Sequence, residues 1–187
     1  MANPAKRHAT YDDLLAVPEH LVAELIHGEL YTYPRPALPH ARATSRLGID
    51  LGGPFDRGKG GPGGWIILDE PELHLHGDVL VPDLAGLRRE RVPEMPTTPA
   101  FELAPDWVCE VLSPATAAVD RTDKMGIYAR EQVRHVWLVD PTIATLEVFR
   151  LLNGKTYEAI VAWRGDATVR AEPFDAIELE LAAIWER

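Results

Sequence analysis

The sequence of 187 residues has a single cysteine, no long apolar run and no excess of basic residues. With only Cys109, it excludes an internal disulfide, so packing must stabilise the fold. No apolar stretch approaches the roughly 20 residues that a membrane helix needs. Residues 1–10 are basic and polar and lack the apolar centre of a signal peptide. These absences predict a soluble protein of the cytoplasm without a membrane partner.

The charge balance is acidic, with 19 Lys and Arg against 29 Asp and Glu and a formal net charge of −10. This argues against a protein that coats nucleic acid, because such domains are usually basic. It still allows an enzyme that binds nucleic acid through a local basic strip beside an acidic metal site. Arg88, Arg89 and Arg91, together with Arg121 and Arg130, are the candidates for that strip. The alternative is a solvated loop.

The length suits one substantial domain and is too short for two comfortable ones. No internal repeat and no linker divides the sequence. We therefore predict a disordered N-terminal tail over residues 1–9 and one domain over residues 10–187.

The first third of the chain predicts two helices and a hairpin. Thr10 is typical of a helix N-cap, because acidic and then apolar residues follow it. Two β-prone runs within residues 23–33 flank His27-Gly28 and predict a hairpin. A second helix is expected over residues 40–51, after a group of prolines, and a mobile loop over residues 52–64.

The rest of the chain predicts short strands over residues 65–68, 72–76, 79–87, 107–112 and 135–139. The run 107–112 is almost continuously apolar, which is typical of a strand covered on both faces. A helix over 119–131 joins it to the next strand and indicates a crossover within one sheet. Asn153-Gly154 predicts a second hairpin, over residues 145–163. The fold class is therefore α/β.

The strongest group of chemical residues is Asp83 after Pro82, Glu110 within its apolar strand, and Lys124 on the following helix. Two carboxylates on neighbouring strands suit Mg²⁺ or Mn²⁺. A nearby lysine can orient a water or stabilise negative charge in the transition state. Glu110 is the best single candidate, because an ionised carboxylate in an apolar strand is costly without a cation. The alternative is a buried Glu110–Lys124 salt bridge without a metal.

An ordered set of motifs is more specific than any one of them: residues 23–30, His40, Pro82-Asp83, residues 110–114, Lys124, Tyr128 and residues 137–141. From about Tyr11 to Trp185, this set resembles the Uma-type family, which is described as a family of restriction endonucleases. That family belongs to the PD-(D/E)XK nuclease superfamily. The resemblance implies an α+β restriction-endonuclease-like core. A central mixed β-sheet would be flanked by helices, with the site at one sheet edge and β-hairpins near both ends of the chain.

The resemblance also implies roles for single residues. Asp83 and Glu110 would bind Mg²⁺ or Mn²⁺, and the backbone carbonyl of Val111 would complete the coordination. The sequence departs from the superfamily motif at Leu112, where a lysine is expected. Lys124 fits a lysine that has moved to the next helix, so catalysis depends on its reaching the site.

Three further residues would support the site. Glu24 matches an acid of the family's N-terminal hairpin and would bind a metal or hold a water; the alternative is an exposed strand carboxylate. His40 would contact phosphate or a metal-bound water, or else form a hydrogen bond at a helix start. Tyr128 lies one turn after Lys124 and is expected to pack or hydrogen-bond beside it.

Together these features predict an Mg²⁺-dependent endonuclease that hydrolyses DNA phosphodiester bonds. Two DNA strands would call for two active sites, and the hairpin Leu146–Val161 is a candidate interface for a homodimer. The first alternative is a catalytically degenerate module that binds nucleic acid or a protein partner. The second is a zinc enzyme that uses His74 and His76, which share a face of a predicted strand.

Overall fold

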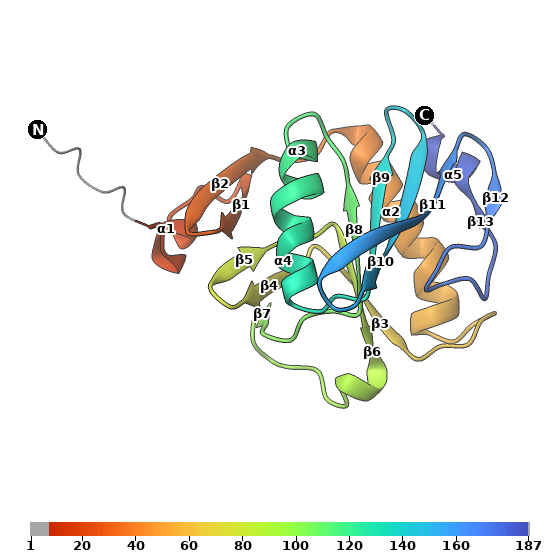
Figure 1. Ribbon diagram of the computed structural model, residues 1–187, viewed down its shortest axis with the longest axis horizontal. Helices are drawn as coiled ribbons and strands as arrows, with labels where there is room; N and C mark the ends of the chain where they lie inside the picture. The colour runs from red at the N-terminus through yellow and green to blue at the C-terminus, as the bar shows by residue number, and fades with distance from the viewer. Residues whose placement is uncertain (1–7, 187) are drawn as a thin grey trace, which may run out of the picture.

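The computed structural model describes residues 8–186 as a mixed α+β fold, with helices on both faces of a central sheet (Figure 1). The α-helices are α1 (Tyr11–Leu15), α2 (Leu38–Leu51), α3 (Ala117–Val119), α4 (Met125–Arg130) and α5 (Leu181–Trp185). Three other helical turns are the π-helical η1 (Gly52–Asp56) and η3 (Asp120–Lys124) and the 3-10 turn η2 (Arg89–Arg91).

The strands form two main sheets and one small one. The central sheet has six strands in the order β11 (Thr156–Arg164), β10 (Thr145–Leu152), β9 (His135–Asp140), β8 (Trp107–Val111), β6 (Leu84–Arg88) and β3 (Trp65–Asp69). The second sheet has five strands in the order β2 (Glu29–Pro34), β1 (Leu21–Ile26), β5 (Asp78–Leu80), β4 (Glu72–Leu75) and β7 (Ala100–Phe101). A short pair consists of β12 (Thr168–Val169) and β13 (Leu179–Glu180).

The central sheet is mixed, as predicted. β8 and β9 are parallel and are joined by the helical segment α3–η3–α4, which confirms the predicted crossover. The other neighbouring strands of this sheet are antiparallel. Side chains of β8 alternate between two cores: Cys109 packs in the core with α2 and α5, whereas Val108 packs in the core with α4. Glu110 therefore points toward α4, because successive side chains of a strand face opposite sides.

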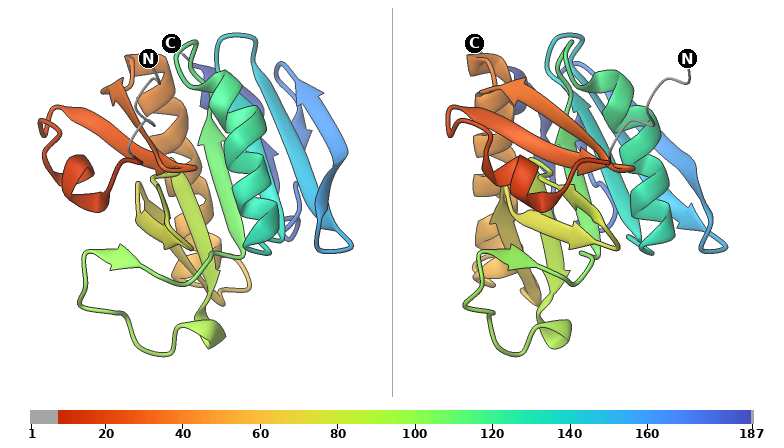
Figure 2. Two further views of the ribbon diagram at one scale, coloured as in Figure 1. Left: turned by 60° about the vertical axis from the view of Figure 1, so that its left-hand side comes forward. Right: turned by 90° about the vertical axis from the view of Figure 1, so that its left-hand side faces the viewer.

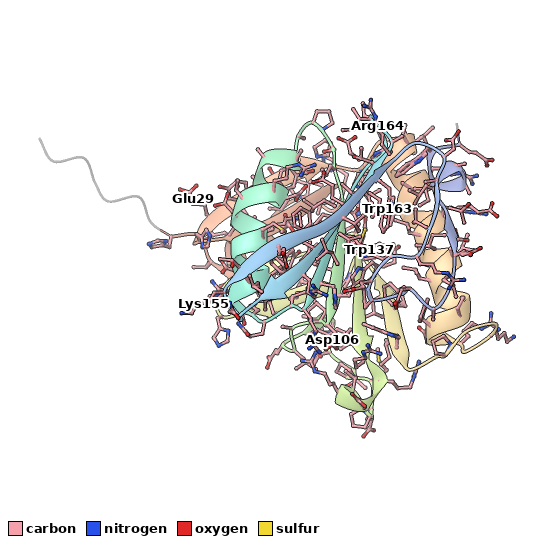
Figure 3. All side chains as sticks on the ribbon, turned by 45° about the vertical axis from the view of Figure 1, so that its right-hand side comes forward. Glu29, Asp106, Trp137, Lys155, Trp163 and Arg164 are labelled. Atoms are coloured by element: carbon pink, nitrogen blue, oxygen red, sulfur yellow. The ribbon has the colours of Figure 1, made fainter. Side chains whose placement is uncertain are left out.

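The two faces of the central sheet are visible in Figure 2, where α4 lies in front of the strands and α2 behind them. The core on the α2 side is built around Phe174, whose ring contacts three buried tryptophans, Trp65, Trp107 and Trp137, at centroid distances of 4.8, 4.8 and 5.6 Å. Figure 3 shows Trp137 in the interior of the molecule. Aromatic side chains bury large areas, so this cluster holds the sheet and the C-terminal segment together.

The N-terminal hairpin β1–β2 has the predicted turn. His27 and Gly28 both have positive φ, 52° and 75°, as a two-residue type I′ turn requires. Thr10 caps α1 with a reciprocal hydrogen bond to Asp13. Residues 1–7 of the predicted tail lie outside the described chain. Ala9, within the predicted tail, donates a backbone hydrogen bond to the Gly28 carbonyl.

The predicted strand over residues 79–87 is instead two strands that belong to different sheets. β5 pairs with β1 and β4 in the five-stranded sheet, and β6 pairs with β3 and β8 in the central sheet. Pro82 lies between them, and its missing N–H cannot continue a ladder. The chain therefore passes from one sheet to the other immediately before Asp83.

Two further boundaries differ from the prediction. α2 begins at Leu38, two residues earlier than expected, because Pro39 lies in the first turn, where a backbone N–H has no intrahelical acceptor. The segment predicted as the mobile loop 52–64 opens with the π-helical turn η1, whose Phe55 is buried against Phe174. No helix in residues 8–186 combines the length and apolar character needed to span a membrane.

Candidate active site

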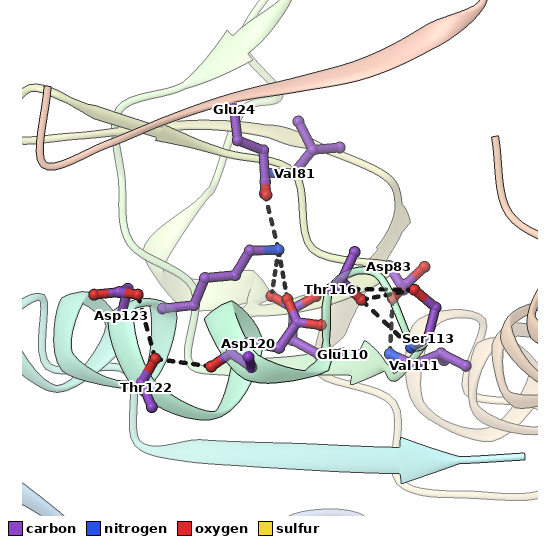
Figure 4. Close-up of polar contacts among 12 residues, drawn as sticks. Glu24, Val81, Asp83, Glu110, Val111, Ser113, Thr116, Asp120, Thr122 and Asp123 are labelled. Carbon is purple, nitrogen blue, oxygen red and sulfur yellow. Dashed lines mark hydrogen bonds and ion pairs between the residues drawn. The ribbon is translucent and has the colours of Figure 1, made fainter. Parts of the chain in front are cut away.

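Four elements bring the predicted site residues together. Glu24 comes from β1 in the five-stranded sheet, and Asp83 from the link between β5 and β6. Glu110 stands on the α4 side of β8, and Lys124 ends the π-helical turn η3. Figure 4 shows Glu24 and Glu110 approaching from opposite sides, with Asp83 beside Val111 at the end of β8. The site therefore lies where the two sheets meet.

Lys124 is the centre of the site. Its Nζ lies 2.9 Å from Glu24 Oε1, 3.0 Å from Asp120 Oδ1 and 3.4 Å from Glu110 Oε1. All four side chains are buried, with exposed fractions between 1% and 3%. The backbone N–H of Val81 also donates to Glu24 Oε1 at 2.8 Å. One ammonium thus bridges three carboxylates from three segments of the chain.

Burial and charge shift the pKa values of this cluster in definite directions. Desolvation raises the pKa of Glu110 well above its usual range, and Asp120, Asp83 and Glu24 add to that shift while Lys124 opposes it. Desolvation raises the pKa of Glu24 as well. Burial alone would lower the pKa of Lys124, but the three carboxylates outweigh it and raise that pKa well above the ordinary value. Lys124 is therefore a cation in the folded protein and cannot act as a general base near neutral pH.

Tyr128 was expected to pack or hydrogen-bond beside Lys124; its hydrogen bond is instead to Glu110, which Lys124 also contacts. Its hydroxyl donates to Glu110 Oε1 at 2.5 Å, and the side chain is buried. Desolvation and the neighbouring Glu110 raise the pKa of Tyr128 well above its usual value, so the hydroxyl keeps its proton. The Tyr128 hydroxyl therefore holds the Glu110 carboxylate in place from the α4 side.

Asp83 forms a second group with His40. Asp83 Oδ2 accepts a hydrogen bond from the Val111 N–H at 2.7 Å, which fixes the carboxylate at the end of β8. His40 Nε2 lies 3.2 Å from Asp83 Oδ1. Burial lowers the pKa of His40, but hydrogen bonds to Asp83 and to the Val111 backbone outweigh it and raise the pKa overall. His40 therefore contacts two of the predicted metal ligands rather than only the start of α2.

These residues line one cavity of about 300 Å³. Its floor consists of the buried Glu24, Glu110, Asp120 and Lys124 and the partly buried Asp83 and His40. Its walls include Tyr33 of β2, the exposed segment Pro34–Ala37, and the loop Ser113–Thr116 after β8. Every predicted site residue except Tyr128 lines the cavity, and Tyr128 contacts it through Glu110.

Sequence reasoning missed Asp120. It contacts Lys124 as closely as Glu24 does, and it is equally buried. A signal was present, because an acid four residues before a lysine on a predicted helix favours an ion pair. Its burial could not be read from that spacing, since it depends on the π-helical turn η3 and on how α3–α4 packs on the sheet. Tyr33 and the prolines of the wall were missed as well.

The predicted basic strip does not reach the cavity. Arg88 stacks over the Trp65 ring at 4.0 Å, Arg89 pairs with Asp56, and Arg91 pairs with Asp106. They follow the end of β6 opposite Asp83, roughly 17 Å away at the usual rise per strand residue. Most described arginines are likewise paired with carboxylates: Arg35, Arg42, Arg46, Arg89, Arg91, Arg121, Arg130, Arg150 and Arg170.

His74 and His76 contact different partners. His74 Nε2 lies 2.7 Å from Glu72 Oε1, which also accepts from the Tyr11 hydroxyl. His76 Nδ1 lies 2.7 Å from Glu131 Oε2 on the surface. The Tyr11–Glu72 hydrogen bond links α1 to β4, and His74 and His76 each contact a local carboxylate.

The oxygen atoms around the cavity have the chemistry of a site for a hard divalent cation. On the floor, four carboxyl groups face one ammonium and one imidazole, so oxygen donors outnumber the nitrogen groups that they contact. Glu24 Oε2 is buried and has no hydrogen-bond partner within residues 8–186. In the same residues, no three His, Cys, Asp or Glu side chains are grouped to hold a metal by themselves. The predicted set of two carboxylates and the Val111 carbonyl does not need a third side chain, and its oxygens fit Mg²⁺ or Mn²⁺.

Comparison with known proteins agrees with this geometry. A family model described as Uma2, putative restriction endonuclease, matches residues 9–183. The chain belongs to the Uma2 family. No curated protein matches it. The fold is similar to the crystal structure of a putative nuclease of the DUF820 family from Anabaena variabilis ATCC 29413, with a TM-score of 0.75 and 22% sequence identity. The alignment covers 94% of this chain and 97% of that chain.

The Uma2 match confirms the family resemblance and the nuclease-like fold. It spans both sheets and every residue of the cavity floor. Neither the match nor the structural likeness assigns roles to single residues. Any role must therefore rest on the contacts that Asp83, Glu110, Lys124 and Glu24 make.

Proposed function

We propose that this protein is an endonuclease that uses Mg²⁺ or Mn²⁺ to hydrolyse DNA phosphodiester bonds. The observation that carries the proposal is the contact of Lys124 with Glu110 in a cavity that also contains Asp83. Lys124, from the next helix, would take the place of the lysine that the superfamily motif has at position 112, since its Nζ lies 3.4 Å from Glu110 Oε1. The family description, a restriction endonuclease, points the same way.

Asp83, Glu110 and the Val111 carbonyl would hold the cation. When bound, such an ion polarises a phosphoryl oxygen and lowers the pKa of a water. Lys124 contributes a fixed positive charge that stabilises negative charge building up on the phosphate. Glu24 and Asp120 hold that ammonium in place, and Tyr128 orients the Glu110 carboxylate through its hydroxyl.

The test uses purified full-length protein with supercoiled plasmid and circular single-stranded DNA, each with Mg²⁺ or Mn²⁺. Circular substrates report internal cleavage directly. We expect cutting by the wild type and its loss in Glu110→Ala and Lys124→Ala. Lys155→Ala, at the exposed tip of the β10–β11 hairpin, should cut like the wild type. Thermal melting of each variant separates loss of chemistry from loss of fold. Intact DNA of both kinds under all conditions would refute the proposal.

One observation favours a second candidate, a non-catalytic module that binds nucleic acid or a partner. Glu110 already contacts Lys124 and Tyr128, and Asp83 contacts His40 and the Val111 N–H, so the protein itself supplies polar partners to both acids. Titration calorimetry with Mn²⁺ separates the two functions. Binding that disappears in Asp83→Asn supports the nuclease, whereas no measurable binding supports the module.

A homodimer remains a prediction. Within the predicted interface, β11 is the outer edge of the central sheet, and Leu152 at the end of β10 is 47% exposed. We propose that this hairpin forms the two-fold contact if a dimer exists. Light scattering at several concentrations tests it, with Leu152→Asp as the disruptive variant; a monomer at every concentration contradicts it.

A further inference from the structure

The cavity has two chemically distinct layers. Its floor is charged and mostly buried, as described above. Its mouth is mostly apolar: we call Tyr33, Pro34, Pro36 and Pro114 the collar, since they line the same cavity but are partly or fully exposed. A nucleotide whose phosphate reaches Asp83 and Glu110 would therefore contact an aromatic ring and proline rings as well as the charged floor.

The collar carries little positive charge. Arg35 is the cation beside it; its Nη1 lies 3.5 Å from Glu70 Oε2, and both side chains are well exposed. Such a surface pair is weak, so Arg35 can exchange Glu70 for a phosphate while its Nη2 keeps the hydrogen bond to the Glu19 carbonyl at 3.1 Å. The Lys124 ammonium and the His40 imidazole, which also line the cavity, already contact carboxylates on the floor. Binding to intact duplex depends on many phosphate contacts, and this face does not provide them.

The collar does provide a surface for a nucleobase. Bases stack on aromatic side chains in proteins that bind single strands, and this stacking tolerates any base because each has a π face. Tyr33 places its ring in the cavity wall, and its buried hydroxyl has no hydrogen-bond partner within residues 8–186. A base in a duplex is already stacked and paired, so it reaches such a wall only after it has been turned out of the helix.

We propose that the cavity takes one unstacked nucleotide of a single strand, with its base against Tyr33 and the prolines of the collar. Its phosphate then lies toward Asp83 and Glu110, and a neighbouring phosphate lies against Arg35. The substrate class is single-stranded DNA, or a DNA segment that opens easily, rather than a stable duplex. This inference rests on the proposed nuclease function and adds the form of DNA that the site accepts.

The experiment uses full-length protein and one oligonucleotide of 20 nucleotides, with 2-aminopurine at an internal position, either alone or in a blunt duplex. Cleavage is measured with Mn²⁺, and binding is measured with Ca²⁺ by the fluorescence of 2-aminopurine. We expect cleavage of the single strand to be at least about tenfold faster than that of the duplex. Tyr33→Ala should weaken binding of the single strand by roughly five- to 150-fold, the range measured for removal of one stacking aromatic residue. Tyr33→Phe should bind like the wild type.

Thr32→Ala is the control, because Thr32 precedes Tyr33 on β2 but is exposed on the other face of the strand and does not line the cavity. It should leave binding unchanged, and melting temperatures verify that each variant folds. Equal or faster cleavage of the duplex overturns this inference and leaves the nuclease proposal intact. Unchanged binding in Tyr33→Ala overturns the role of the collar. No cleavage of either form refutes the nuclease proposal, and the inference with it.

Discussion

Replacing Lys124 with methionine tests the charge arrangement of the site apart from any activity. Methionine keeps much of the length of the side chain but leaves the Glu24, Glu110 and Asp120 carboxylates buried without their common cation. Removing one partner of a buried ion pair typically costs about 3–5 kcal/mol, because the remaining charge stays desolvated. For a domain of this size, that corresponds to a fall in Tm of roughly 6–20 °C.

The assay is urea unfolding at pH 7, followed by tryptophan fluorescence, since three of the tryptophans are fully buried. Lys155→Met is the control; its side chain is exposed, so its free energy of unfolding should stay within about 0.5 kcal/mol of the wild type. The double variant Lys124→Met with Glu24→Gln should lose less than the sum of the two single variants, because the second change removes one of the stranded charges.

Two results would refute this reasoning. The first is a Lys124→Met variant within about 1 kcal/mol of the wild type, which would show that the carboxylates do not depend on this cation. The second is strict additivity in the double variant, which would show that Glu24 and Lys124 do not interact energetically.

Three further predictions concern stability. Phe174→Ala should cost about 3–5 kcal/mol in chemical denaturation, because it empties the centre of the aromatic cluster, whereas Ile143→Ala on the surface should cost little. Gly86→Ala should lower the Tm, since a Cβ there would lie 3.1–3.2 Å from atoms of two tryptophan rings; an unchanged Tm would mean that these rings can shift. Burial lowers the pKa of His135, so the unfolded state binds that proton more readily, and stability is lost as the pH falls below the ordinary value of about 6.5. His135→Gln should flatten this part of the curve of unfolding free energy against pH, and an identical slope would contradict the assignment.

The sequence predicted those parts of the fold that depend on local pattern. The apolar run around Glu110, the helix that carries Lys124 and the next strand were recognisable because each element has its own periodicity and the crossover rule joins them. The two hairpins followed from His27-Gly28 and Asn153-Gly154. A two-residue hairpin turn needs positive φ at both positions, and few residue pairs without glycine accept it.

The parts that depend on contacts between distant segments were less predictable. Residues 79–87 were expected to form one strand, because nothing in their pattern shows that Pro82 separates two sheets. Asp120 was overlooked because the sequence does not show that this turn of the helix is buried, together with Lys124 one turn later. Nothing in the sequence distinguishes Glu24 from an exposed strand carboxylate. Its burial depends on the pairing of β1 with β5, because Val81, the residue after β5, donates its backbone N–H to Glu24.

The site takes residues from two sheets, Glu24 from the five-stranded sheet and Glu110 from the central sheet, and this affects the order in which it is assembled. Glu110, Lys124 and Tyr128 all belong to the continuous unit from β8 to β9, so their contacts require only short loops to close. Glu24 is far from these residues in the sequence and joins them only after the five-stranded sheet has docked. Bringing it to Lys124 closes a longer loop, which costs more conformational entropy. We therefore expect the acidic centre to be completed late in folding. A partly folded chain, in which the two sheets have not yet docked, would then contain the Glu110–Lys124 pair without Glu24.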